Sequence, residues 1–174
     1  MDFKKFIESQ ELSDHPIGLG GCRNMDYFFD SCDYDIMVFD ENRSNREVIS
    51  FENNLVTLHH ASLSETNTKK LLQYDNLKIL QDASWNLKIF LSKISEKRNS
   101  LFSDFAKNSL IESIFCCQKT KDGVENDDVF ASCWQKCASY YLADAISSLN
   151  NSPSSPSHLL DSLRKFEKTS INNH

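Results

Sequence analysis

Residues 18–40 read GLGGCRNMDYFFDSCDYDIMVFD, and this stretch carries the strongest pattern in the sequence. Three of the four glycines of the 174-residue chain fall within it, at positions 18, 20 and 21. Asp33 and Asp35 follow, and the apolar run Ile36–Phe39 after them predicts a strand. Alternate residues of a strand point to the same face, so the two carboxylates should lie side by side. The stretch therefore predicts a glycine turn next to a strand that begins with a pair of acids.

The glycines and the carboxylates suit phosphate chemistry. Glycine lets backbone N–H groups approach an anion closely, and a helix N-terminus nearby favours negative charge. Asp33 and Asp35 could hold one divalent cation, which would offset the repulsion between their like charges. A phosphate cradle beside a Mg²⁺-binding carboxylate pair is what phosphoryl or nucleotidyl transfer needs. An ordinary turn followed by a strand that enters from solvent explains the same residues equally well.

The composition restricts the class of protein and of partner. The net charge is −6 and the pI about 5.3, so no extended nucleic-acid-binding surface is expected. The opening MDFKKFIESQELSD mixes both charges and does not resemble a signal peptide. No apolar run reaches the ~18 residues that a membrane span needs. We therefore expect a soluble, cytoplasmic protein without a membrane partner.

The cysteines do not follow a metal-binding pattern. The sequence has Cys22, Cys32, Cys116, Cys117, Cys133 and Cys137. None of them forms a CxxC pair, so no metal–thiolate site is predicted. A disulfide framework is not expected without a secretory signal. We interpret the cysteines as small apolar side chains in the core.

The first half of the chain alternates short helical and strand patterns. We expect a helix over 2–12, strands over 17–21, 34–39 and 77–80, a helical stretch over 23–29, and a hairpin of 46–51 with 55–60 around Asn53-Asn54. After residue 84 the apolar period is helical, with segments over 85–94, 101–115 and 129–149 and a last helix over 158–166 capped by Ser157. The predicted class is α+β, with a mixed sheet flanked by helices in residues 1–83 and a helical bundle in residues 84–174.

The clearest predicted helix follows Gly123. Its apolar residues fall in pairs every four positions: Val129-Phe130, Cys133-Trp134, Cys137-Ala138, Tyr141-Leu142 and Ala145-Ile146, with Leu149 last. A four-residue step advances slightly more than one turn, so the apolar face becomes wide along the helix. We expect a central bundle helix that begins at Asp127 or Asp128.

The order of these elements resembles the nucleotidyltransferase fold of kanamycin nucleotidyltransferase, DNA polymerase beta and the minimal nucleotidyltransferases. The pattern of that family is Gly-Gly/Ser followed by Asp-x-Asp/Glu on the next strand. Gly20-Gly21 and Asp33-Tyr34-Asp35 match it here. The segment LKILQD, residues 77–82, resembles the late strand of the family, and residues 84–166 resemble the helical bundle of its aminoglycoside-modifying branch.

The resemblance implies a set of site residues. Asp33 and Asp35 would hold Mg²⁺, and Gly20, Gly21 and Arg23 would contact the phosphates of a nucleoside triphosphate (NTP), with ATP as the expected nucleotide. The carboxylates should share one solvent-reachable cleft, ~3–5 Å apart so that both reach one cation. The two glycines should form the opposite lip of that cleft.

One departure from the family concerns its third carboxylate. Active members carry it on a strand after the Asp-x-Asp strand, where Thr57 and His59 stand in this chain. Asp82 could replace it only if the last strand lies beside the site. His59 could act as a base or metal ligand, although a structural imidazole on the sheet surface is the plainer interpretation.

Three functions remain open at this point. The first is Mg²⁺-dependent transfer of a nucleoside monophosphate from an NTP to an unknown acceptor. The second is a catalytically silent nucleotide-binding or regulatory protein of the same fold, such as one half of a toxin–antitoxin-like pair. The third is a helical interaction module. The sequence leaves a homodimer open.

Overall fold

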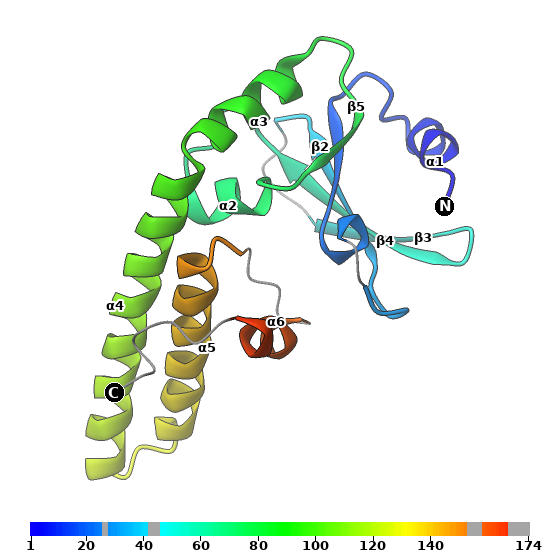
Figure 1. Cartoon of the computed structure of the whole chain (residues 1–174). Helices are drawn as coiled ribbons and strands as arrows, with labels where there is room; N and C mark the ends of the chain where they lie inside the picture. The colour runs from blue at the N-terminus through cyan, green and yellow to red at the C-terminus, as the bar shows by residue number, and fades with distance from the viewer. Residues whose placement is uncertain (26–27, 42–45, 153–157, 167–174) are drawn as a thin grey trace. The chain divides into compact units, whose positions relative to one another are not determined.

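The computed structural model describes residues 1–25, 28–41, 46–152 and 158–166 (Figure 1). The chain divides into two compact units, Met1–Arg98 and Asn99–His174. The first unit contains the sheet and also helix α3 (Asn86–Glu96). The boundary predicted after residue 83 would have placed this helix in the second unit. The second unit is helical. Within the described residues, no helix combines the length and the apolar character that crossing a membrane requires.

The first unit is built on a five-stranded mixed sheet with the order β3-β4-β2-β1-β5. The strands are β1 (Ile17–Gly20), β2 (Tyr34–Phe39), β3 (Arg46–Phe51), β4 (Asn54–Ala61) and β5 (Lys78–Gln81). Strand β4 runs parallel to β2, and the other neighbouring pairs are antiparallel. The predicted α+β class, a mixed sheet flanked by helices and followed by C-terminal helices, is confirmed.

Helices cover both faces of this sheet. Helix α1 (Phe3–Ser9), whose N-terminus is capped by Asp2, buries Phe6 and Ile7 against one face. The residues of the sheet in this core cluster are Ile17, Leu19, Ile36, Val38, Val56 and Leu58. On the other face, the ring of Phe39 lies 5.5 Å from that of Tyr74, which follows α2 (Thr68–Gln73), and 5.9 Å from that of Phe90 in α3. Because Val38 and Phe39 point to opposite faces, the apolar run of β2 is buried on both sides.

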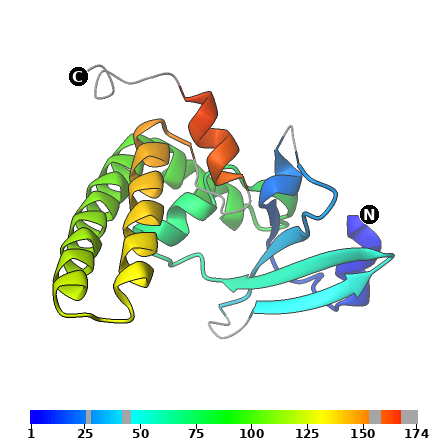
Figure 2. The ribbon, with the colours of Figure 1, turned by 90° about the horizontal axis from the view of Figure 1, so that it is seen from below.

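The predicted hairpin is confirmed, with its turn one residue earlier. Phe51 pairs with Asn54, which leaves Glu52 and Asn53 as a two-residue loop. Their φ angles are 48° and 62°, the positive values that a tight hairpin loop requires. Figure 2 shows β3 and β4 as a long two-stranded ribbon. Asn54 begins β4 and does not belong to the turn.

One local prediction in the first unit was wrong, and one helix was missed. The helical stretch expected over residues 23–29 is a short 3₁₀ turn, η1 (Cys22–Asn24), followed by Met25 in an extended conformation. Residues 26–27 lie outside the described part of the chain, and Phe28 and Phe29 belong to no helix. Helix α2 was not predicted, although Asn67 caps it by accepting a hydrogen bond from the backbone N–H of Lys70.

The second unit contains α4 (Arg98–Glu125), α5 (Ala131–Leu149) and α6 (Leu159–Lys165). Helix α4 runs through Gly123. Helix α5 begins at Ala131, directly after a turn in which the side chain of Asp128 accepts a hydrogen bond from the N–H of Phe130. The predicted start at Asp127 or Asp128 was therefore a few residues early. The predicted cap of the last helix, Ser157, lies outside the described residues.

Helices α4 and α5 pack antiparallel through small side chains. Ser113 donates a hydrogen bond to the carbonyl oxygen of Ala138, and a Cβ at Gly123 would lie 3.1 Å from that of Ala131. Phe102 of α4 is buried, but many of the other large apolar residues are exposed, among them Ile111, Ile114, Phe115, Phe130, Leu142, Ile146 and Leu149. The wide buried face predicted for residues 129–149 was wrong, because both members of the first apolar pair are exposed, as are members of the later pairs such as Leu142 and Ile146.

Candidate functional site

Strands β2 and β4 bring four polar side chains together at the start of β2. The parallel register places Asp35 beside Thr57, and alternation along β4 puts His59 on the same face as Thr57. The Thr57 hydroxyl donates a hydrogen bond to Oδ2 of Asp33. Nε2 of His59 lies 2.9 Å from Oδ1 of Asp35. Each aspartate of the predicted pair thus has its own partner on the neighbouring strand.

The glycine turn lies directly on this cluster. Gly20 pairs with Asp35 across β1 and β2. Gly21 has φ 65° and ψ −168°, a conformation that is essentially confined to glycine. A Cβ at Gly21 would lie 2.0 Å from Oδ2 of Asp35. Both the backbone conformation and the lack of space therefore require glycine at position 21.

The carboxylate oxygens of Asp33 and Asp35 are ligands of the kind that hard cations prefer. Asp35 and His59 are partly exposed, with 24% and 30% of their side-chain surface open to solvent. Within the described residues, Asp33, Asp35 and His59 do not bring three ligand atoms within 4.8 Å of one another. Two carboxylates without a complete protein cage fit Mg²⁺, which is usually bound by one or two carboxylates together with water and substrate phosphates. The predicted separation of the carboxylates stays a prediction.

Arg23 organises the segment that leads into β2. Its Nε donates to the carbonyl oxygen of Cys32 at 2.9 Å, and its Nη2 donates to that of Asp30 at 3.1 Å. The guanidinium also lies over the rings of Phe28 and Tyr34, 4.4 Å and 5.0 Å from their centroids. This side chain, predicted to contact phosphate, holds its own loop in the structure. A contact of Arg23 with nucleotide stays a prediction.

Asp82 lies away from the cluster. Strand β1 separates β5 from β2, and Ile17 of β1 pairs with both Gln81 and Val38. Asp82 therefore follows β5 at the end of the sheet where β2 finishes, whereas Asp33 precedes β2. Oδ2 of Asp82 accepts a hydrogen bond from the N–H of Lys88 at 2.9 Å, in the first turn of α3. Asp82 could supply a third carboxylate only if β5 lay beside the site, and β5 does not.

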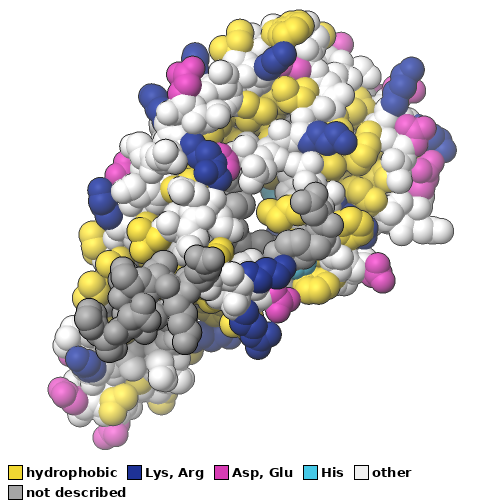
Figure 3. All heavy atoms as spheres, in the orientation of Figure 1, with side chains coloured by type: hydrophobic (Ala, Val, Ile, Leu, Met, Phe, Trp, Pro, Cys, Tyr) yellow, Lys and Arg dark blue, Asp and Glu magenta, His cyan; other side chains and the backbone are white. Residues whose placement is uncertain are grey.

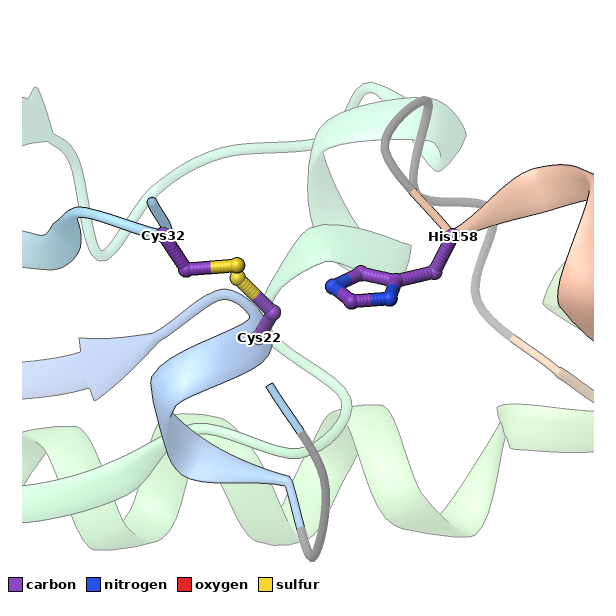
Figure 4. Close-up of side chains that lie close together, drawn as sticks. All are labelled: Cys22, Cys32 and His158. Carbon is purple, nitrogen blue, oxygen red and sulfur yellow. The ribbon is translucent and has the colours of Figure 1, made fainter. Parts of the chain in front are cut away.

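Two cysteines next to the cluster were not predicted to lie together (Figure 4). Cys22 directly follows Gly21 and is buried, and Cys32 directly precedes Asp33 and is partly buried. Their sulfur atoms lie within 4.8 Å of each other. Burial, reinforced by a hydrogen bond with Cys32, raises the pKa of the Cys22 thiol to about 12. The only signal in the sequence is that both cysteines adjoin motif residues.

Comparison with known proteins gives similarity at the level of structure. No family model matches the sequence, and no curated protein matches it. A nucleotidyltransferase-like protein from Exiguobacterium sibiricum is similar in structure, with a TM-score of 0.46 and 11% sequence identity over 98% of this chain and 68% of that chain. Function is therefore inferred from the residues of the site.

On the molecular face in Figure 3, Lys and Arg side chains are scattered among acidic and apolar ones.

Proposed function

We propose that this chain binds an NTP as its Mg²⁺ complex and transfers the nucleoside monophosphate to an unknown acceptor. The observation that carries the proposal is the contact between Gly21 and the carboxylate of Asp35. Because the turn carries no side chain at Gly21, Oδ2 of Asp35 faces backbone on that side, while Oδ1 faces His59. A phosphate bridging turn and carboxylate would meet both a metal ligand and peptide N–H groups. ATP is the nucleotide we expect.

The two aspartates have the role of metal ligands in this proposal. Each has one oxygen engaged, Asp33 by the hydroxyl of Thr57 and Asp35 by the imidazole of His59. These hydrogen bonds would hold the carboxylates in place while the metal is bound. When bound, Mg²⁺ would polarise the α-phosphate and offset the charge that develops on pyrophosphate. Gly20 and Gly21 would contact the phosphates through their backbone.

His59 is the proposed base. Its Nε2 faces Asp35, so Nδ1 would take the proton from the attacking hydroxyl of the acceptor. The hydroxyl oxygen forms a bond to the α-phosphorus, and the bond from that phosphorus to pyrophosphate breaks. Asp35 would stabilise the imidazolium that results. Its partial exposure leaves the imidazole of His59 open to an acceptor that arrives from solvent.

A catalytically silent nucleotide-binding protein is the second candidate. Thr57 favours it, because a buried neutral hydroxyl stands next to Asp35 where the resemblance calls for a third acid. Release of pyrophosphate separates the two functions. We would incubate the protein with Mg²⁺, each of the four common NTPs and a mixture of hydroxyl-bearing small molecules and proteins as acceptors, and detect pyrophosphate enzymatically.

The assay has a clear outcome for each candidate. Pyrophosphate release that is lost in Asp35→Asn and kept in Asp104→Asn, an exposed aspartate of α4, supports transfer. Mg²⁺-dependent binding without any pyrophosphate supports the silent protein. A helical interaction module would show neither, and the exposed apolar residues of α4 and α5 would then be its most relevant feature.

A further inference from the structure

Two thiols of the first unit converge beside the candidate site. Cys22 lies in η1 and Cys32 in the segment before β2, and their side chains point toward each other with the sulfurs within 4.8 Å (Figure 4). The backbone is drawn together at the same place, because Nε of Arg23 donates to the carbonyl oxygen of Cys32 at 2.9 Å. These are the only cysteines among residues 1–98.

We propose that Cys22 and Cys32 form a reversible intramolecular disulfide. The sulfurs already face each other within 4.8 Å, and closing the bridge brings them to the ~2 Å of a disulfide bond. The co-reactant is a small-molecule disulfide of the glutathione class. Nothing in this step depends on nucleotide or metal.

The chemistry is an exchange in two steps. Cys32 is the less buried residue of the two, so its sulfur is the one that local opening of the segment exposes first. It attacks the small disulfide, forms a mixed disulfide and releases one thiolate. Cys22 then attacks the Cys32 sulfur of the mixed disulfide, forms the protein disulfide and releases a second thiolate. Both protein thiols lose their protons to solvent. Two protein thiols are oxidised and one small disulfide is reduced, and excess thiol reverses the reaction.

The bridge would fix the glycine turn in place. It would join the residue after Gly21 to the residue before Asp33, so the contact of Gly21 with Asp35 could not open. A triphosphate that enters between turn and carboxylate requires that opening. We therefore expect the disulfide form to bind Mg²⁺–ATP more weakly than the thiol form. This consequence rests on the proposed function, whereas the disulfide itself does not.

Peptide mapping tests the disulfide directly. Trypsin cleaves after Arg23 and places the two thiols on separate peptides, residues 6–23 and 24–43. The whole protein would be equilibrated with oxidised glutathione, blocked with iodoacetamide, digested and analysed by mass spectrometry. We expect the two peptides as one cross-linked species that reduced glutathione separates. Oxidation should also raise the urea midpoint, because the bridge restricts the unfolded chain.

Matched variants complete the test. Cys32→Ser should abolish the cross-linked species, and Cys133→Ser, which changes an exposed cysteine of α5, should leave it intact. The proposal is overturned if both peptides of the wild type stay separately alkylated at every glutathione ratio, or if they link only to cysteines of other molecules. Equal affinity of both redox forms for Mg²⁺–ATP would refute the regulatory consequence. Absence of ATP binding by the reduced protein would refute the proposed function and leave the cross-link as it is.

Discussion

Gly21 lies against the carboxylate of Asp35, so closely that a Cβ on the glycine would be 2.0 Å from Oδ2. The two residues come from different elements: the turn after β1 and the first part of β2. This contact joins the two motifs that dominate the sequence. It makes the glycine a requirement of the site as well as of the turn.

Replacing Gly21 by Ala should destabilise the protein. The backbone conformation alone costs a non-glycine residue about 1–3 kcal/mol, and displacement of Asp35 adds to this. Urea unfolding measures the loss. Gly20→Ala is the matched control, because the nearest atom to a Cβ there would be the end of the flexible Leu77 side chain, at 3.3 Å, and the next atoms lie at ordinary contact distances of 3.6 Å and more. Equal losses in the two variants would contradict the account of Gly21.

Arg23→Lys should lower the free energy of unfolding by about 1–2 kcal/mol. Lysine keeps the charge but cannot donate to two carbonyl oxygens in a fork while lying flat over an aromatic ring. Arg164→Lys changes an exposed arginine of α6 in the same way and should leave the urea midpoint nearly unchanged. A midpoint for Arg23→Lys within error of the wild type would show that the loop does not depend on this side chain.

Glu65 gives a prediction for pH. Its carboxylate accepts hydrogen bonds from the N–H groups of Asn67 and Thr66, each 2.9 Å long, and pairs with Lys70. These interactions lower the pKa of Glu65 below its ordinary value of 4.5, and the hydrogen bond from the N–H of Asn67 contributes most. The folded-state pKa is thus lower than the unfolded one, so the stabilisation is present above 4.5 and is lost as the pH falls through the lowered pKa.

Glu65→Gln should therefore lower the free energy of unfolding near neutral pH by about 1 kcal/mol. The difference from the wild type should shrink when both proteins are unfolded in acid, where Glu65 is protonated. Glu96→Gln, at the C-terminal end of α3, serves as the control of the same chemistry. A difference that is independent of pH would show that the charge of Glu65 does not contribute.

His59→Ala should leave binding of Mg²⁺–ATP intact and reduce turnover by roughly 10²-fold or more, the usual contribution of a general base. The backbone of Asp35 keeps its place in this variant because Gly20 still pairs with it across the sheet, and bound Mg²⁺ would hold the carboxylate in place of the imidazole. Calorimetry gives the affinity, and pyrophosphate release gives the rate. Unchanged turnover would remove His59 from the mechanism and leave it a structural partner of Asp35.

Much of the sheet follows from local sequence. The run Ile36–Phe39, buried on both faces, and the hairpin around Glu52-Asn53 could be read from apolar runs and turn residues. The short helix after Asn67 could not, because its six residues give too little periodicity. The stretch after Arg23 was misread as a helix because the hydrogen bonds that shape its loop reach carbonyl groups several residues away.

The sequence indicates which acids belong to the candidate site, but it does not indicate which residues contact them. Spacing alone places Asp33 and Asp35 on one face, and this needs no knowledge of the fold. The partners of these acids depend on the register between β2 and β4, which sets Asp35 beside Thr57. No property of Thr57 in the sequence marks it as a hydrogen-bond donor to Asp33. Long-range register, not composition, determines this part of the site.

Isothermal titration of ATP, with and without Mg²⁺, tests the central claim most directly. Asp33 and Asp35 alone should bind free Mg²⁺ weakly, so metal and nucleotide should each raise the affinity for the other, by roughly tenfold or more. Asp35→Asn keeps the shape of the side chain and removes its charge, and it should abolish this coupling, whereas Asp104→Asn should not. Identical affinities of the wild type for ATP with and without Mg²⁺ would contradict the assignment of Asp33 and Asp35 as a nucleotide–metal site.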